Sequence, residues 1–240
     1  MHSALKGVVL VAALVLAACT GTQDTSRILV FGGTGKLGSE IVKDLVERGQ
    51  PVTVFARPTS DRSLLDGLEV EYVVGDVLNE DEVAAAFRVA PMRVVIVALA
   101  KRPDDPNSPY DIGQQHISRA ALETGVEQMI LISSVGAGDE RPDYFPEESW
   151  DMFSTVMVEK GAAERTVLDS PVPYTVIRTY EVKAMSEPPT GAAILSEDES
   201  VRLPVTRPDL AALVVGCVDN PECIGAIYHA GDETLPAFEF

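Results

Sequence analysis

The sequence predicts an α/β fold built on a single doubly wound parallel sheet. Short apolar runs typical of strands alternate along the chain with stretches whose apolar residues recur at helical spacing. The run at 94–99 is apolar throughout, which indicates a strand buried on both faces in the centre of a parallel sheet. The chain has 240 residues, and no repeat or second linker interrupts it after residue 27. We therefore expect one domain over 27–240.

The elements follow one another in a regular order. We expect strands at 28–31, 51–56, 68–74, 93–99, 128–133, 174–178 and 226–229. We expect helices at 39–48, 79–87, 111–125, 150–169 and 208–218, the second capped by Asn79 and the last capped near Thr206. The segment 179–203 lacks strong periodicity, and we expect it to cover a ligand cleft at the carboxyl ends of the strands.

A glycine-rich turn joins the first strand to the first helix. Residues 33–38 fit the pattern G-x-G-x-x-G, and Gly32 precedes them. Glycine lets the backbone approach a pyrophosphate closely, and the helix N-terminus offers unpaired N–H groups and a partial positive charge. The pattern alone is weak, and a tight turn with close helix packing is the alternative. The strand before it and the helix after it favour a dinucleotide site of the Rossmann type.

Arg57 follows directly after the second strand. A Rossmann unit that binds NAD places an acidic residue here to hold the ribose 2′-hydroxyl, whereas an arginine can hold the 2′-phosphate of NADP. Arg57, helped by Arg62 or Ser60, therefore favours NADP(H) over NAD(H). A solvated loop arginine is the alternative.

The first 18 residues are expected to be a signal peptide. Lys6 supplies a positive charge, and 7–18 is an apolar run of the length of a signal-peptide core. A transmembrane helix needs about 20 apolar residues, which is more than this run provides. A signal cut at an Ala-x-Ala-like site and a buried element of the domain are the alternatives, but the polar linker at 19–26 disfavours the second.

The end of this run, Leu16-Ala17-Ala18-Cys19, resembles the lipobox of bacterial lipoproteins. The resemblance implies that Cys19 is lipidated and becomes the mature N-terminus, which would anchor the chain in the cell envelope on the periplasmic side. Thr20 follows the cysteine where an aspartate would favour retention, so the outer membrane is favoured over the inner one.

Charge, cysteines and histidines exclude some classes of function. A formal net charge of −18 disfavours a nucleic-acid surface, which needs clustered Lys and Arg. The spacing of the His and Cys residues predicts no metal site. Cys217 and Cys223 could pair across a helix end in an exported protein, but the apolar pattern around Cys217 favours a small core residue, which we expect. We expect His116 on the surface and Asp209 near a helix N-terminus, and His229 receives no role.

Several short motifs occur in an order typical of one family. They are Phe31–Gly38, Val52–Arg57, Val74–Asp76, Ile130–Gly136, Lys160–Glu164, Tyr174–Arg178 and Thr206–Ala211. From residue 28 to about 231 the chain resembles atypical short-chain dehydrogenases/reductases, in the NmrA-like and flavin (biliverdin-IXβ) reductase-like group of NAD(P)-binding proteins.

The resemblance implies a set of cofactor-binding residues. Those at the pyrophosphate would be Gly32, Thr34, Gly35, Lys36, Leu37 and Gly38. Arg57 would contact the 2′-phosphate, Asp76 and Val77 the adenine, Leu99 and Ala100 the ribose, and Ser133 the nicotinamide.

The chain departs from the family at the catalytic pair Tyr-x-x-x-Lys, in which the lysine lowers the pKa of a tyrosine acid. Lys160 holds the lysine position, but Val156 stands where the tyrosine would be. Ser133, Lys160 and Tyr144 are the candidate catalytic residues, with Tyr110 as another tyrosine and Ser134 as another serine. A solvated Lys160 paired with Glu164 one helical turn on is the alternative.

We therefore expect an NADP(H)-binding, oxidoreductase-like protein. Without the usual tyrosine, hydride transfer would go to a small acceptor such as a flavin, quinone or tetrapyrrole, with a proton taken from water. The alternative is a non-catalytic NAD(P)-binding sensor or interaction protein of the NmrA-like kind, anchored to the membrane; the scarcity of NADPH expected outside the cytoplasm favours it. The intact glycine turn argues against a scaffold that binds no nucleotide.

Overall fold

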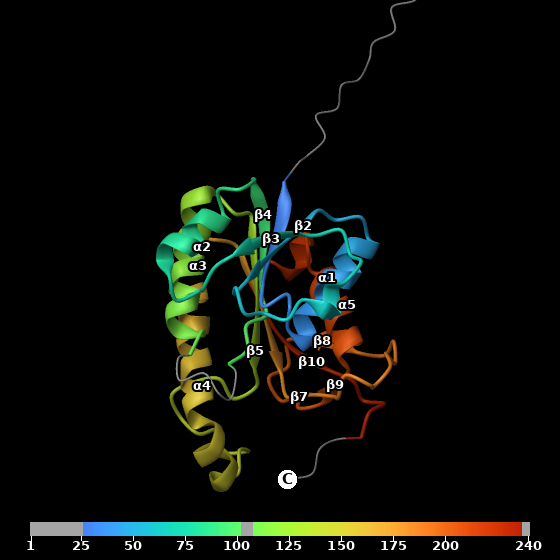
Figure 1. The fold of residues 1–240 in the computed structure, drawn as a ribbon. Helices are drawn as coiled ribbons and strands as arrows, with labels where there is room; N and C mark the ends of the chain where they lie inside the picture. Colours follow the sequence, from blue (N-terminus) through green and yellow to red (C-terminus); the bar gives the residue numbers. More distant parts are fainter. Residues whose placement is uncertain (1–25, 102–107, 237–240) are drawn as a thin grey trace, which may run out of the picture.

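Eight strands form one sheet in the order β3-β2-β1-β4-β5-β6-β10-β8 (Figure 1). The computed structural model describes residues 26–101 and 108–236. The strands of this sheet are β1 (Arg27–Phe31), β2 (Val52–Ala56), β3 (Glu71–Val74), β4 (Met92–Val97), β5 (Gln128–Ser134), β6 (Tyr174–Thr179), β8 (Ile194–Ser196) and β10 (Ala226–Gly231). All neighbours pair in parallel except β8, which pairs antiparallel with β10 at the edge. The predicted doubly wound parallel sheet is confirmed.

Helices cover both faces of the sheet. They are α1 (Lys36–Glu47), α2 (Glu80–Ala86), α3 (Asp111–Thr124), α4 (Glu147–Leu168) and α5 (Arg207–Gly216), with two short 3-10 turns at Ser63–Leu65 and Pro221–Cys223. In Figure 1, α2, α3 and α4 lie on one side of the sheet, and α1 and α5 lie on the other. All five helices were expected, with ends that differ by a few residues.

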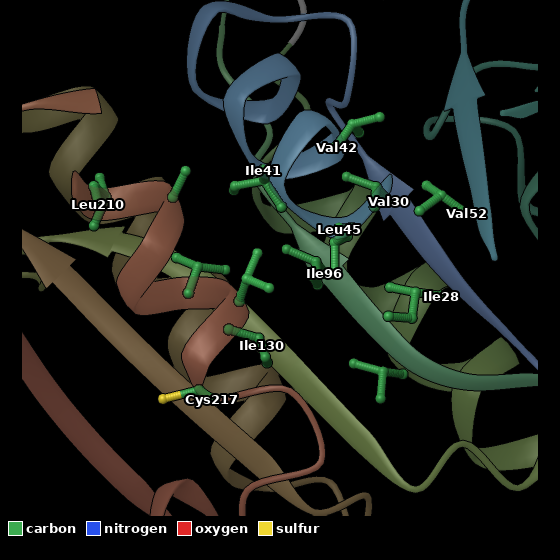
Figure 2. Packing of buried hydrophobic residues seen from close by; sticks show 14 of the residues in the cluster. Ile28, Val30, Ile41, Val42, Leu45, Val52, Ile96, Ile130, Leu210 and Cys217 are labelled. Carbon is green, nitrogen blue, oxygen red and sulfur yellow. The ribbon is translucent and has the colours of Figure 1, made fainter. Parts of the chain in front are cut away.

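The core is divided between these two faces because strands buried on both sides direct alternate residues to opposite helix layers. Figure 2 shows α1 and α5 side by side on one face, with Ile41 and Leu45 of α1 beside Val30 and Ile96 of the sheet. Each of these four side chains is fully buried. This packing fixes the start of α1 against the end of β1, where the glycine turn lies.

The two predicted caps are confirmed. The side chain of Asn79 accepts hydrogen bonds from the backbone N–H groups of Asp81 and Glu82, and Thr206 accepts one from Asp209. Each cap satisfies N–H groups that have no partner inside the helix. Asp209, expected near a helix N-terminus, lies in the first turn of α5 and also accepts backbone N–H groups of residues 190 and 191.

The segment 179–203 contains regular structure that the sequence did not predict. Besides β8, it includes β7 (Glu181–Val182), which pairs in parallel with β9 (Pro204–Val205). A strand of two or three residues is too short to show a period of two, so its pattern cannot be separated from that of a loop. These strands hold the segment beside the carboxyl ends of the main sheet.

The expectation that Cys217 is an unpaired core residue was wrong. Cys217 and Cys223 form a disulfide with their Cα atoms 5.5 Å apart. Cys217 is nevertheless buried, with 1% of its surface exposed, and belongs to the core under α5. Core packing and cross-linking are compatible at this residue, which does both.

The expected signal peptide at 1–18 and the lipidated Cys19 lie outside the described residues. Among residues 26–101 and 108–236, every helix is too short or too polar to cross a bilayer.

Candidate functional site

The chain changes direction across the sheet between β1 and β4. These strands are neighbours, but β1 leads through α1 to β2 on one side while β4 leads through α3 to β5 on the other. Ligands of open α/β sheets bind at such a switch point, beyond the carboxyl ends of the strands. Two adjoining cavities lie there, of about 510 and 290 Å³. Both touch Gly35, Lys36 and residues 98–100, which follow β4.

The larger cavity, here called the turn cavity, borders the glycine turn. Gly32 has φ +79°, and a Cβ on it would lie 2.3 Å from the carbonyl oxygen of Ala98. A Cβ on Gly38 would lie 2.1 Å from the carbonyl oxygen of Gly32. Both positions therefore exclude a side chain. Gly35 caps α1 without a side-chain hydrogen bond, so the first N–H groups of the helix remain available to an anion.

Most of the predicted cofactor-binding residues gather at the turn cavity. Besides Gly32, Thr34, Gly35 and Lys36, its lining contains Arg57, Asp76, Val77, Leu99 and Ala100. Ser60 lines it as well, but Arg62 is absent from the lining and its guanidinium stacks 4.3 Å from the centroid of the Tyr72 ring. Asp61, which the sequence reasoning did not single out, also lines the cavity; its carboxylate accepts the N–H of Ser63 at 2.9 Å.

His116 is better buried than expected. Its Nδ1 lies 2.8 Å from the carbonyl oxygen of Val77, and the residue is half-buried on α3. The expectation of a surface histidine is therefore corrected. The ring contacts the segment after β3, which forms one wall of the turn cavity.

The smaller cavity, here called the lysine pocket, contains Lys160. Its Nζ donates a hydrogen bond of 2.7 Å to Ser134 Oγ and lies 5.3 Å from the centroid of the Tyr110 ring. Leu37, Gly38 and Ser133 also line this pocket, together with Thr179 and Arg207. The predicted Ser133 and Lys160 are thus brought together with the glycine turn.

Lys160 is not the solvated partner of Glu164. Glu164 is buried and accepts two hydrogen bonds from the guanidinium of Arg178, at 2.6 and 3.1 Å. Burial lowers the pKa of Lys160 from its usual 10.5 to about 8, with the negative charge of Glu164 as a smaller opposing effect. A lysine with this pKa can exchange a proton near neutral pH.

The two candidate tyrosines lie in different places. Tyr110 lines the lysine pocket, and its hydroxyl accepts the backbone N–H of Lys101 at 3.0 Å. Burial raises the pKa of Tyr110, so the phenol stays protonated. Tyr144 is absent from the described lining of either cavity, and Arg202 stacks on its ring at 3.5 Å. The geometry therefore brings Tyr110, rather than Tyr144, to the lysine.

Ser133 and Ser134 have different environments. Ser134 is engaged by Lys160, whereas Ser133 is 2% exposed and its Oγ has no hydrogen-bond partner in the described part of the chain. A buried hydroxyl without a partner is costly, and this one borders the lysine pocket. Ser133 therefore offers a hydrogen bond to a ligand.

The described residues contain no group of three or more His, Cys, Asp or Glu side chains able to hold a metal ion. The polar groups of the two cavities suit an organic, phosphate-bearing ligand. The glycine turn, the uncapped α1 N-terminus and Arg57 fit a dinucleotide. Together with the parallel sheet they define a Rossmann-type dinucleotide-binding protein.

Comparison with known families agrees with this class. The profile of the NAD(P)H-binding family matches residues 32–221. The chain belongs to this family.

Individual relatives are distant. An uncharacterised chloroplast protein of Arabidopsis thaliana is 26% identical over 199 residues, which cover 79% of this chain and 70% of that protein. Sterol demethylase protein B of Methylococcus capsulatus is 32% identical over 126 residues, which cover 51% of this chain and 38% of that protein. The chain thus spans a little over two thirds of the first relative and under half of the second.

Among solved structures, the anaerobillin reductase ChuY of Escherichia coli O157:H7 superposes with a TM-score of 0.77 at 24% identity, covering 89% of this chain and all of that one. A short-chain dehydrogenase/reductase of Veillonella parvula in complex with NADP gives a TM-score of 0.70 at 15% identity, with coverages of 89% and 99%. At these identities the likeness establishes the fold.

Proposed function

We propose that this protein binds NADPH in the turn cavity and transfers hydride to a small organic acceptor in the lysine pocket. The observation that carries the proposal is the shared wall of the two cavities at 98–100 and at the glycine turn. A dinucleotide held by that turn would have room for its reactive end in the adjoining lysine pocket, which Lys160 lines. Bound NADPH would supply two electrons and one hydrogen as hydride, and one further proton completes reduction of the acceptor.

Tyr110 supported by Lys160 is the proposed source of that proton, in place of the water expected from the sequence. Val156 stands at the family's tyrosine position, but Tyr110 reaches the same lysine from the loop after β4. Its raised pKa keeps the phenol protonated before the transfer. Lys160, which titrates at about 8, is placed to assist the transfer and to be reprotonated from water.

NADPH is proposed over NADH because Arg57 and Ser60 line the turn cavity together. A guanidinium can bind the 2′-phosphate with charge-assisted hydrogen bonds. We expect Arg57→Ala to weaken NADPH binding at least about tenfold, equivalent to about 1.4 kcal/mol, and NADH binding much less. Arg62→Ala, which removes an arginine outside the lining, is the matched control. Equal losses for the two nucleotides would contradict this preference.

The decisive experiment is NADPH oxidation followed by absorbance, with menadione, riboflavin and the phosphate-bearing FMN as acceptors. Turnover that depends on Tyr110 and Lys160 is the expected result. Tight NADPH binding without turnover would instead favour the non-catalytic sensor or interaction protein, the alternative that the missing tyrosine at 156 supports. Absence of nucleotide binding by the folded protein would reject both.

We also propose that the chain is exported and anchored through a lipidated Cys19 on the periplasmic side of the cell envelope, with the outer membrane favoured. The disulfide supports export, since such bonds persist in oxidising compartments. Labelling with a fatty acid in the bacterial host tests the anchor. Incorporation that is lost in Cys19→Ser is expected, and label retained in that variant would refute it.

A further inference from the structure

The lysine pocket has an uneven distribution of charge. Lys36, Lys160 and Arg207 line it, and no Asp or Glu occurs among the described residues of the lining. The whole chain carries a formal net charge of −18, so a carboxylate-free cavity with several cations is a local exception. Of the three, Lys36 is exposed and Lys160 has the negative charge of Glu164 nearby, whereas Arg207 is half-buried with no acidic group acting on it. Partial withdrawal of a cation from water without a counter-charge is unfavourable. A negatively charged ligand would relieve this cost.

Two of these cations already have partners or roles. Lys160 donates to Ser134. Lys36 is the first residue of α1 and also borders the turn cavity, where the pyrophosphate of the proposed dinucleotide would lie. Arg207 remains, and neither the glycine turn nor the proton transfer requires it.

Arg207 is the first residue of α5 and is held in place at one end of its guanidinium. Its Nη1 donates to the carbonyl oxygen of Lys183, which follows β7. A guanidinium has five N–H donors, and this is the one hydrogen bond of its side chain recorded within the described residues. Burial lowers the pKa of Arg207, and no acidic neighbour counteracts the effect. The group remains charged all the same.

Ser133 provides an independent indication of a ligand. Its buried Oγ borders the same pocket and has no partner within the described chain. A hydroxyl donor and an arginine fork are suited to the oxygens of a carboxylate or a phosphate. The pocket also has apolar walls from Leu99, Ile132 and Val182, which suit an uncharged ring.

We propose that the ligand of the lysine pocket is an anionic acceptor, an organic ring carrying a carboxylate or phosphate group that Arg207 and Ser133 bind. That the ligand accepts hydride rests on the proposed function, but the binding of its anionic group can be measured without turnover. Arg207 is then the residue that selects charged over uncharged acceptors.

The test compares pairs of ligands that differ in charge. FMN and riboflavin share one ring system and differ by a phosphate, while 2-naphthoate and 2-naphthamide differ by a carboxylate charge. Affinities are measured with the full protein saturated with NADP⁺, by flavin fluorescence for the first pair and calorimetry for the second. We expect at least about tenfold tighter binding of the charged member of one pair, as for a charge-assisted hydrogen bond.

Arg207→Met should abolish this preference, and Arg202→Met is the matched control. Arg202 stacks on Tyr144 and is absent from the lining of the pocket, so its loss should leave the preference intact. Arg207→Lys keeps the positive charge but lacks the paired N–H donors of a guanidinium. It should retain part of the preference for the charged ligand. If Arg207→Met does not fold, the wild-type preference and the Arg207→Lys variant still decide the question.

The outcomes separate the two proposals. A preference in the flavin pair identifies a phosphate, and one in the naphthalene pair identifies a carboxylate. Equal affinities in both pairs, no binding in either pair, or a preference that survives in Arg207→Met overturns the anionic site. Turnover of riboflavin as efficient as that of FMN, with equal affinities, overturns this inference and leaves hydride transfer standing. Charge-selective binding without any turnover does the reverse.

Discussion

The turn cavity and the lysine pocket adjoin, but they are built in different ways. The turn cavity depends on backbone geometry within one short segment, where Gly32 and Gly38 approach other backbone atoms too closely for any side chain. The lysine pocket depends on side chains from separate elements, namely Tyr110 before α3, Ser134 at the end of β5 and Lys160 in α4. A substitution in the glycine turn should therefore disrupt the whole turn cavity. A substitution in the lysine pocket should remove only the role of the side chain that is replaced.

The largest effect is expected from Gly38→Ala. The new Cβ would lie 2.1 Å from the Gly32 carbonyl oxygen, so the turn must move. We expect NADPH affinity to fall roughly 100-fold, or about 2.8 kcal/mol, and stability to fall by about 3 kcal/mol, the upper range for overpacking. Nucleotide titration and urea unfolding measure the two.

Gly216→Ala is the control for that substitution. This glycine ends α5 and has no atom within 4 Å of the added Cβ, so stability should stay level or rise by up to about 1 kcal/mol. Nucleotide affinity near the wild-type value in Gly38→Ala would show that the glycine turn can move without loss of binding.

The second prediction separates the tyrosines. Tyr110→Phe should lower kcat for the acceptor about 100-fold, as expected for removal of a general acid, while NADPH affinity changes little. Tyr144→Phe should leave kcat within about twofold, because this ring contacts Arg202 rather than Lys160. Steady-state kinetics at saturating NADPH provide the comparison. The opposite ranking would restore Tyr144 as the acid.

The third prediction concerns pH. Lys160 is charged below its pKa of about 8 and neutral above it, so kcat should decline as pH rises through 8. In Lys160→Met, kcat should already be reduced and should not decline further as pH rises through 8. A pH profile in the variant that matches the wild type would assign the titration to another group.

Stability gives the same test a second readout. Because the pKa of Lys160 is lower folded than the usual 10.5, the unfolded chain binds more protons between these values. The contribution of this lysine to stability therefore rises with pH from about 8 to 10.5 and is least favourable below 8. Urea unfolding of wild type and Lys160→Met at pH 7 and 10 should show the difference moving in favour of the wild type at the higher pH.

The smallest effect on the site is expected from removing the disulfide. Replacing Cys217 and Cys223 together by alanine should lower stability by about 2–3 kcal/mol, the value for a short cross-linked loop. Neither residue lines a described cavity, so NADPH affinity and kcat should stay within about twofold of wild type. A large loss of either would show that the two ends of α5 are coupled.

How much of the site could be predicted from the sequence depends on the difference between a cavity built from one chain segment and a pocket built from distant side chains. The glycine turn was predictable because its geometry is set by neighbours in the chain, and the strand and helix on either side have clear periods. The contact of Tyr110 with Lys160 joins residues 50 positions apart in the chain, and no local pattern encodes it. Tyr110 and Tyr144 were equivalent as loop tyrosines after strands. Only packing separated them.

Two other misses have physical causes. The strands between 181 and 205 are stabilised by pairing with distant partners, since two or three residues have too little local preference to be recognised. Arg207 was seen as part of a family motif, but its place in the lysine pocket depends on how α5 packs beside α1. Ser133 was found because it ends a strand at the edge where ligands bind.

The disulfide has a kinetic consequence as well. Cys217 and Cys223 are 1% and 5% exposed, and the cross-link joins the end of α5 to the turn before β10. A reductant in solution can attack a sulfur only when this part of the fold opens. The rate of reduction by a small thiol therefore measures local opening there, independently of global unfolding. The disulfide is therefore a built-in probe of local opening beneath α5.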